Sequence, residues 1–393
     1  MRASYQITEY GSFSRDKEAF GCTPLPQNTF DALENFVIAN SSDEGAAVDI
    51  MGLSVRKGIG KIITAKNYVG VISMKDGTSI EILPKIYSKE TVTEGKVKQL
   101  LVDMLKTLNN APFKSFQNAN INIEKLPIFE IFIRIFVDEV FRIVKRGLKS
   151  DYKTIQSNEN IYKGKMIFTG QIKHNYAHKE RCYVEYDKFN TNCAENRILK
   201  ATLSCLYKKT VSQKNKTDIK TLLNAFNEVD ESQNYKSDFD IIIPDRKTTD
   251  YQTALLWSKV FLMGKSFTSF AGSEVAFALL FPMETLFESF VAVQLKKALG
   301  ETKYVLSVQD KIHHLFDEPK KFLLQPDIVI RHKELQKIFV MDTKWKILSD
   351  CNANYGISQA EMYQMYAYQK KYRSENVTLL YPLTEKVDNS RNI

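Results

Sequence analysis

The chain has 393 residues and a net charge of +9, and 44% of its residues are hydrophobic, as expected of a globular protein with two or three domains. Its five cysteines are scattered without a CxxC pair, which argues against disulfides and a zinc cluster and favours a reducing compartment. The N-terminus lacks the apolar core of a signal peptide, so we expect a cytoplasmic protein without membrane contact.

The first third of the sequence has a β pattern. The segments "NYVGVISM" and "SIEILPK" flank "KDGT", and Asp-Gly between alternating apolar segments is a strong hairpin signal. Apolar residues then recur at helical spacing over residues 97–108. These patterns predict a β-rich N-terminal domain at residues 1–115.

The middle of the chain is predicted to be mainly helical. The run "PIFEIFIRIFVDEVFRIV" carries charges at i,i+4 steps, which indicates an amphipathic core helix over about 127–146 and not a membrane span. Residues 150–193 alternate short β-like pieces with polar turns, and "AENRILKATLSCLYKKT" is typical of a helix. We predict a helical middle region at residues 116–252.

This middle region is strongly basic. Between Arg142 and Arg181 there are ten lysines and arginines against three acidic residues. Such an excess suits a polyanion, most often nucleic acid, although a solvated basic face that meets an acidic partner is the alternative. In "IYKGKMIF", Lys163 and Lys165 lie two apart on an expected strand, so they would share a face and contact DNA phosphates together.

The last part of the chain, residues 253–393, is predicted to be a mixed α/β domain. It is mostly helical to residue 299, and "FLLQPDIVIRHKELQKIFVMDTKWKI" then indicates a β-hairpin of residues 322–330 and 337–345. A helix, "SQAEMYQMYAYQKKY", and a short strand, "VTLLYP", follow. The whole chain is therefore predicted to be mixed α/β.

The predicted hairpin carries charges where apolar residues are expected. Asp342 and Lys344 are two apart, so they emerge on one face, and Asp327 lies on the neighbouring strand. Glu288 lies on the preceding helix. Carboxylates gathered in this way suit Mg²⁺, which prefers oxygen ligands and retains waters. The spacing Pro-Asp, fourteen residues, Asp-x-Lys is the PD-(D/E)xK nuclease signature; a hairpin with solvent-facing charges is the alternative.

Two further patterns bear on ligand binding. Gln364 and Tyr368 share one face of the last helix, as in the QxxxY element of RecB-like nucleases that contacts DNA, although an ordinary amphipathic helix would show the same spacing. "GKSFTS" at residues 264–269 resembles a phosphate loop, but Lys259 stands where its first glycine is required. We therefore expect no nucleotide site in this chain.

Three segments together resemble the McrC family. These are "NYVGVI…IEILPKI", "YDKFNTNCAENRILKATL" and "ALLFPMETLFESFVA…QPDIVI…DTKWK…YQMYAY", which occur in this order over most of the chain. The resemblance implies the nuclease subunit of a prokaryotic McrBC-type restriction system that cuts double-stranded DNA with modified (methylated) cytosine. It implies a McrB-like AAA+ GTPase ring as partner, docked and activated by the N-terminal domain.

The resemblance also implies roles for the site residues. Asp327, Asp342 and Lys344 are expected to form the catalytic trio of a C-terminal PD-(D/E)xK deoxyribonuclease core, with Glu288 as the helix carboxylate. Asp327, Asp342 and Glu288 would bind Mg²⁺, for which Mn²⁺ can substitute. A stand-alone RecB-like nuclease and a non-catalytic GTPase-activating adaptor remain as alternative functions.

Overall fold

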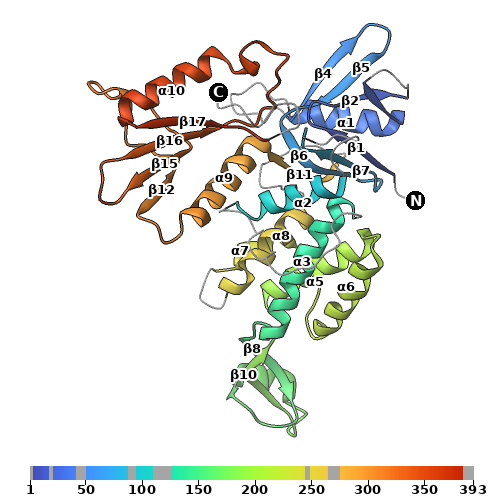
Figure 1. Ribbon diagram of the computed structural model, residues 1–393. Helices are drawn as coiled ribbons and strands as arrows, with labels where there is room; N and C mark the ends of the chain where they lie inside the picture. Colours follow the sequence, from blue (N-terminus) through green and yellow to red (C-terminus); the bar gives the residue numbers. More distant parts are fainter. Residues whose placement is uncertain are drawn as a thin grey trace. The chain divides into compact units, whose positions relative to one another are not determined.

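The structure is a computed structural model, in which the chain forms two compact units. The first unit joins residues 1–128 to residues 266–393, and the second holds residues 129–265. The described part contains ten α-helices and five small sheets, so the predicted mixed α/β class is confirmed (Figure 1). The predicted division into residues 1–115, 116–252 and 253–393 stays a prediction. The described residues are 3–16, 21–40, 50–86, 94–108, 126–243, 248–263 and 275–383.

Two four-stranded sheets make up most of the N-terminal part of the first unit. The elements are β1 (Ser4–Thr8), β2 (Ser12–Arg15), β3 (Cys22–Leu25), α1 (Gln27–Asn40), β4 (Met51–Arg56), β5 (Gly60–Ala65), β6 (Tyr68–Met74), β7 (Ser79–Leu83), α2 (Glu94–Leu105) and β11 (Val275–Pro282). One sheet has the order β1-β7-β6-β11 and the other β3-β2-β5-β4. The predicted Asp-Gly hairpin is confirmed, because β6 and β7 pair antiparallel across a turn in which Gly77 has a φ of +90°.

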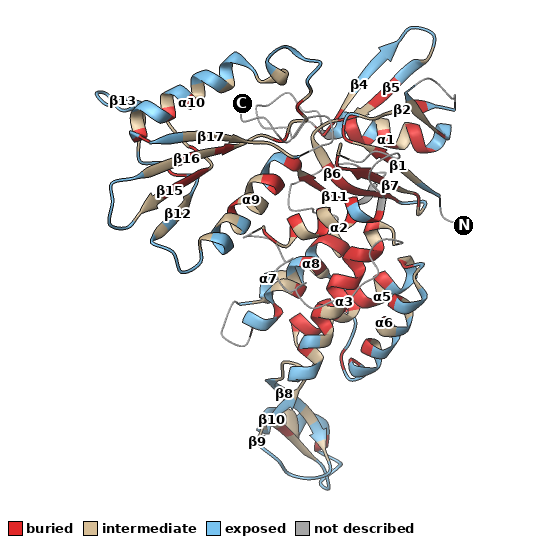
Figure 2. Ribbon diagram, viewed as in Figure 1, coloured by how far each residue is buried: buried red, intermediate tan, exposed pale blue. Residues whose placement is uncertain are grey.

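One hydrophobic core serves both of these sheets. Phe13 of β2, Phe30 of α1 and Ile72 of β6 belong to the same buried cluster, and all three are fully buried. Figure 2 shows that β6, β7 and β11 are largely buried. The interior positions of these strands are almost all apolar, as expected of strands covered on both faces.

The strand β11 differs from the prediction, which treated residues 253–299 as mostly helical. It pairs antiparallel with β6, and Gly70 of β6 approaches Leu279 so closely that a Cβ would lie 1.9 Å from its carbonyl oxygen. The sequence "VAFALLFP" is a short and almost wholly apolar run. Periodicity alone does not separate a buried strand from a buried helix in such a run.

The second unit is built around helices. They are α3 (Ile128–Arg146), α5 (Ala194–Lys209), α6 (Gln213–Ala225), α7 (Tyr235–Ile241) and α8 (Gln252–Met263), with a 3₁₀ turn at Thr249–Tyr251. The amphipathic helix predicted over 127–146 is confirmed as α3. Its Phe132 and Phe136 are fully buried, and Phe132 packs on Trp257 of α8 with ring centroids 5.7 Å apart.

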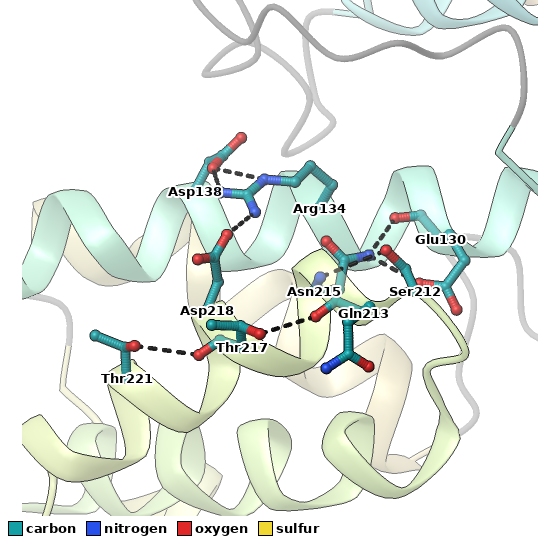
Figure 3. A network of polar contacts seen from close by, with 9 residues as sticks. All are labelled: Glu130, Arg134, Asp138, Ser212, Gln213, Asn215, Thr217, Asp218 and Thr221. Carbon is teal, nitrogen blue, oxygen red and sulfur yellow. Dashed lines mark hydrogen bonds and ion pairs between the residues drawn. The ribbon is translucent and has the colours of Figure 1, made fainter.

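A buried polar network joins α3 to α6 (Figure 3). The Glu130 side chain of α3 is 2% exposed, and its carboxylate accepts a hydrogen bond of 2.8 Å from Asn215 Nδ2. One turn further along α3, Arg134 pairs with Asp138 of the same helix and with Asp218 of α6. The charges on the polar face of α3 are thus matched by partners inside the unit.

A small sheet extends the second unit beyond the C-terminal end of α3 (Figure 1). It contains β8 (Asp151–Glu159), β9 (Lys165–Met166), α4 (Phe168–Asn175) and β10 (Cys182–Asn190), with the strand order β8-β10-β9. The β-like pieces predicted within residues 150–193 are therefore confirmed. Most side chains of β8 are exposed (Figure 2).

The C-terminal part of the first unit is a four-stranded sheet between two helices. Its elements are α9 (Met283–Leu299), β12 (Tyr304–Val308), β13 (His314–Phe316), β14 (Lys321–Leu323), β15 (Ile328–His332), β16 (Ile338–Thr343), α10 (Gln359–Tyr372) and β17 (Asn376–Leu380), with a 3₁₀ turn at Ala353–Gly356. The strand order is β12-β15-β16-β17. Met365 and Tyr368 of α10 pack on Val340, whereas Ala292 of α9 packs on Ile328, so the helices cover opposite faces (Figure 1).

The predicted hairpin exists but is shorter than expected. β15 begins at Ile328, six residues later than predicted, because residues 321–323 pair with β13 in a separate two-stranded sheet. Pro326, which has no N–H to donate, lies between these two strands. The strand β12 was not predicted. Among the described residues, no helix is long and apolar enough to cross a membrane.

Candidate active site

The register of β15 and β16 brings Asp327 and Asp342 together. Ile328 pairs with Met341 at the end of the ladder, so the next position places Asp327 across from Asp342. The Asp327 carboxylate is held there by Thr343, whose backbone N and Oγ1 donate to Oδ2 at 2.6 and 2.7 Å. Two carboxylates therefore face each other at the end of this strand pair, as the sequence predicted.

Asp342 and Lys344 share a face of β16 and its extension, as predicted from their spacing. Lys344 Nζ lies 2.5 Å from Asp342 Oδ2. Asp342 is 1% exposed, and its Oδ2 has no hydrogen bond of good geometry in the described part of the chain, although the ammonium is this close. The carboxylate thus has a nearby charge partner but an unfilled hydrogen-bonding position.

The electrostatics of the site oppose the charged forms of Asp342 and Glu288. Burial raises the pKa of Asp342, and so does the Asp327 carboxylate, while Lys344 offsets part of this effect. Burial also raises the pKa of Glu288, followed by the effect of Asp327. Burial is the largest influence on Lys344 and disfavours its charged form, but the nearby Asp342, Asp327 and Glu361 carboxylates together outweigh burial, and the pKa of the ammonium is raised. The acids are crowded with negative charge and Lys344 stays protonated.

Glu288 comes from α9, and Gln309 links it by hydrogen bonds to Asp327. Gln309 Nε2 donates to Glu288 Oε1 at 3.0 Å, and its backbone N donates to the Asp327 carbonyl at 2.8 Å. Gln309 adopts a φ of +46°, which is uncommon for a residue other than glycine. Nothing in the sequence pattern singled out this residue.

The three acids do not form a closed set of metal ligands. Within the described ranges, no group of three His, Cys, Asp or Glu side chains lies close enough to hold a metal ion. Their chemistry nevertheless fits Mg²⁺, which takes one or two protein carboxylates and keeps several waters. A cation would also relieve the repulsion between Asp327 and Asp342 and occupy the open position at Asp342 Oδ2.

Gln364 and Tyr368 lie together on α10, as predicted. Gln364 Nε2 donates to the Tyr368 hydroxyl at 2.8 Å. Tyr368 is 3% exposed, and its pKa is raised to about 12 by burial and by the nearby Asp342 and Asp327 carboxylates. The Tyr368 ring is packed in the core, while its hydroxyl lies near the acids.

Two more residues near the site were not predicted. Glu361 stands in the first turn of α10, where it forms a capping box with Ser358, and its carboxylate influences both Asp342 and Lys344. Tyr381 follows β17, and its hydroxyl is buried without a hydrogen-bond partner among the described residues. Burial raises the pKa of Tyr381 to about 12, as do Glu361 and Asp342. A helix-cap pattern could have located Glu361 on α10, but no local signal links it to Asp342.

Lys163 and Lys165 lie in the second unit. Only Lys165 is part of a strand, because Gly164 between them adopts a φ of +67°; the expectation that both share one strand face is wrong. Lys163 Nζ lies 3.2 Å from Glu159 Oε1 and 3.9 Å from the centroid of the Tyr186 ring. Lys165 is exposed on β9. The segment "GKSFTS" at 264–269 lies outside the described residues.

Comparison with known proteins places these features in a family. The model described as "McrBC 5-methylcytosine restriction system component" matches residues 63–382. The fold is similar to a chain in the refined half-complex from the tetradecameric assembly of Thermococcus gammatolerans McrB AAA+ hexamers with bound McrC. The TM-score is 0.70 at 18% identity, over 98% of this chain and 89% of that chain.

A second solved structure gives a weaker match. A chain of the cryo-EM structure of the Thermococcus gammatolerans McrBC complex matches with a TM-score of 0.55 and 18% identity, over 76% of this chain and 89% of that chain. No curated protein matches the sequence. The family match covers most of the chain, including every residue of the candidate active site. The chain therefore belongs to the family of McrBC 5-methylcytosine restriction system components.

Proposed function

We propose that the chain is the Mg²⁺-dependent DNA endonuclease subunit of a GTP-driven restriction complex that cuts DNA with methylated cytosine. The observation that carries the proposal is the facing pair Asp327 and Asp342, with the Lys344 ammonium 2.5 Å from the second acid. Glu288 on the adjoining helix lies near enough for both acids to influence its pKa. The family match supports a restriction component, and the acid–acid–lysine arrangement supports a hydrolytic role for it.

Asp327 and Asp342 would hold the metal ion, and Glu288 of α9 would contribute through a bridging water. When bound, the ion would polarise a phosphate oxygen and lower the pKa of a coordinated water. Lys344 enters this site as an ammonium, because its pKa is raised. We therefore assign to Lys344 Nζ the donation of a hydrogen bond that orients the attacking water, rather than the removal of its proton.

The partner and substrate are proposed from the family and from the similar structures. The solved assemblies hold McrB AAA+ hexamers with McrC, and we propose a McrB-like GTPase ring as the partner of this chain. The N-terminal residues 1–115 would dock on that ring and stimulate GTP hydrolysis. The family description names 5-methylcytosine, which supports double-stranded DNA with this base as the substrate.

Two surfaces are proposed to contact DNA. Gln364 lies beside the Tyr368 hydroxyl near the acids, where its amide could bond a phosphate or base edge. Lys165 is exposed on the small sheet of the second unit, and Gly164 alone separates it from Lys163 in the sequence. Lysines of this kind contact phosphates, which position a duplex without reading its sequence.

A cleavage assay separates this proposal from its alternatives. The chain is assembled with a McrB-like AAA+ GTPase, and methylated and unmethylated DNA are incubated with Mg²⁺, with and without GTP. The proposal predicts cleavage of methylated DNA only in the complete mixture. Cleavage without partner or GTP would instead indicate a stand-alone nuclease, and stimulated GTP hydrolysis without cleavage would indicate an adaptor.

A further inference from the structure

Trp345, the residue after Lys344, is held by a buried carboxylate from the N-terminal strands. Its indole Nε1 donates to Glu9 Oε1 and Oε2 at 3.1 and 2.9 Å. Trp345 is 6% exposed and Glu9 is 3% exposed. Glu9 directly follows β1, and its backbone N donates to the Leu83 carbonyl at the end of β7.

Lys85 holds the other side of the same residue. Its Nζ donates to the Trp345 carbonyl oxygen at 2.6 Å, and its backbone N donates to Glu9 Oε2 at 2.9 Å. The Lys85 ammonium also lies 5.6 Å from the centroid of the Trp345 ring. Both the indole and the main chain of Trp345 are thus fixed by groups at the ends of β1 and β7.

Trp345 is joined to both halves of the candidate active site. It is the chain neighbour of Lys344, whose backbone N donates to Leu380 of β17 at 2.9 Å. Its ring also packs on Phe287 of α9, with centroids 5.3 Å apart, and Phe287 immediately precedes Glu288. A shift of Trp345 would therefore move the strand extension that carries Lys344 and the helix that carries Glu288.

A contact that only stabilised the fold would not need both a carboxylate and an ammonium around Trp345. Burying the Glu9 carboxylate and half-burying the Lys85 ammonium is costly, and apolar residues of similar size often stabilise a core equally well. Other charged groups face the same cluster: Glu284 acts on both Glu9 and Lys85, and Lys346 acts on Lys85. Directional hydrogen bonds to the Trp345 indole and to its carbonyl oxygen fix the orientation of this residue as well as how deeply it is buried.

We propose that Glu9 and Lys85 are positioning residues of the nuclease site, which act through Trp345 to set the placement of Lys344 and Glu288. This inference rests on the proposed endonuclease function. It also gives the N-terminal strands a direct mechanical link to the residues proposed for cleavage. Residues that orient an active site from outside it typically change metal affinity or activity by roughly ten- to a hundredfold when removed.

The test uses the full chain in its complex with the partner GTPase. Glu9→Gln and Lys85→Met should lower kcat for DNA cleavage by about ten- to a hundredfold, with KM for DNA unchanged. Lys85→Arg keeps a donor for the Trp345 carbonyl and should restore most of the rate. Glu81→Gln is the matched control, because Glu81 is a buried carboxylate of the same sheet whose oxygens accept from the Ile128 backbone N and pair with Lys98.

A second readout follows Trp345 without relying on cleavage. The chain contains two tryptophans, so Trp257→Phe leaves Trp345 as the single tryptophan, whose emission can be excited selectively over that of the tyrosines. In that background, a Mg²⁺ titration followed by Trp345 emission should show a weaker midpoint for Lys85→Met than for the parent, and an unchanged midpoint for Glu81→Gln. In a double-mutant cycle on kcat, Glu9→Gln should add no further loss once Trp345→Phe is present.

Asp342→Asn in the same assay separates the two proposals. If Asp342→Asn is inactive while Glu9→Gln and Lys85→Met cut and bind Mg²⁺ like the wild type, the positioning role is wrong and the nuclease assignment stands. An equal loss of kcat in Glu81→Gln would reduce the effect to general destabilisation and would also overturn the positioning role. If Asp342→Asn still cuts DNA, the site assignment fails and the positioning inference fails with it.

Discussion

Asp342 carries a charge that the metal-free fold disfavours. Its pKa is raised, chiefly by burial and then by Asp327. A carboxyl whose pKa rises on folding contributes stability below its unfolded pKa and loses that contribution as pH rises through its folded pKa. At neutral pH the ionised Asp342 therefore works against the folded state until a cation binds.

The raised pKa of Asp342 leads to a prediction for Asp342→Asn. The neutral near-isostere should abolish cleavage, while the metal-free protein at pH 7 melts at the same temperature as the wild type or higher. Mg²⁺ should raise the melting temperature of the wild type and have little effect on the variant. Thermal unfolding with and without Mg²⁺ checks this. A clear loss of metal-free stability in Asp342→Asn would contradict the electrostatic reading of the site.

The pKa shifts also predict how Mg²⁺ binding depends on pH. Asp342 and Glu288 both have raised pKa values, so protons compete with the metal at a higher pH than ordinary carboxyls, which titrate near about 4, would allow. The Mg²⁺ midpoint, measured by titration at a series of acidic pH values, should weaken as pH falls and begin to do so above that ordinary range. Constant affinity down to about pH 4 would show that these acids do not bind the ion.

At the scale of elements, Asp310 is a second buried carboxylate, and its pKa is shifted in the opposite direction from that of Asp342. Burial is the largest influence and works against its charge, but the hydrogen bonds from Arg331, the Ile312 backbone N and the Tyr372 hydroxyl together outweigh burial and lower the pKa of Asp310. Arg331 Nη2 donates to Asp310 Oδ2 at 2.8 Å, and the Tyr372 hydroxyl of α10 donates to Oδ1 at 3.0 Å. Asp310 therefore ties β15 and α10 to the segment that follows β12.

Asp310→Asn should consequently destabilise the protein, in contrast to Asp342→Asn. We expect a loss of about 1–3 kcal/mol in the free energy of unfolding, the usual effect of weakening buried hydrogen bonds to a charged group. The contribution of Asp310 is present above its unfolded pKa and disappears as pH falls through its lower folded value, so the two proteins should converge in strong acid. Denaturant unfolding at neutral and acidic pH measures both effects, and a constant difference would be the contrary result.

The elements also show which parts of the site can be predicted from the sequence. Strand alternation and hairpin pairing placed Asp327, Asp342 and Lys344 together, because these rules act over short separations in the chain. The strands β11 and β12 were missed, the former because a buried apolar run fits a strand or a helix equally well. Gln309 and Glu9 were missed because their contacts depend on how separate elements pack, which no local pattern records.

At the scale of the whole molecule, the second unit carries the basic stretch from Arg142 to Arg181. If Lys163 and Lys165 contact DNA phosphates, replacing both with alanine should lower affinity and reduce the log–log salt slope by about 0.9 for each duplex phosphate lost. The effect should be equal for methylated and unmethylated DNA. Because Lys163 is already engaged by Glu159, we expect Lys165→Ala to account for most of the change.

A matched pair of lysines provides the control for this experiment. Lys214 and Lys220 of α6 are exposed in the same unit but lie outside the basic stretch. Their double alanine variant removes the same charge and should leave the salt slope unchanged. If both pairs behave alike, or if Lys163 and Lys165 affect only assembly with the partner, the basic stretch is a protein-contact or solvated surface.

The most direct measurement is cleavage of methylated DNA by the wild type and Asp342→Asn, each assembled with the partner GTPase, GTP and Mg²⁺. GTP hydrolysis is recorded in the same tubes as a control for folding and assembly. We predict that both proteins stimulate GTP hydrolysis equally and that only the wild type cuts the DNA. Equal cleavage by Asp342→Asn would contradict the assignment of the nuclease site to Asp327, Asp342 and Lys344.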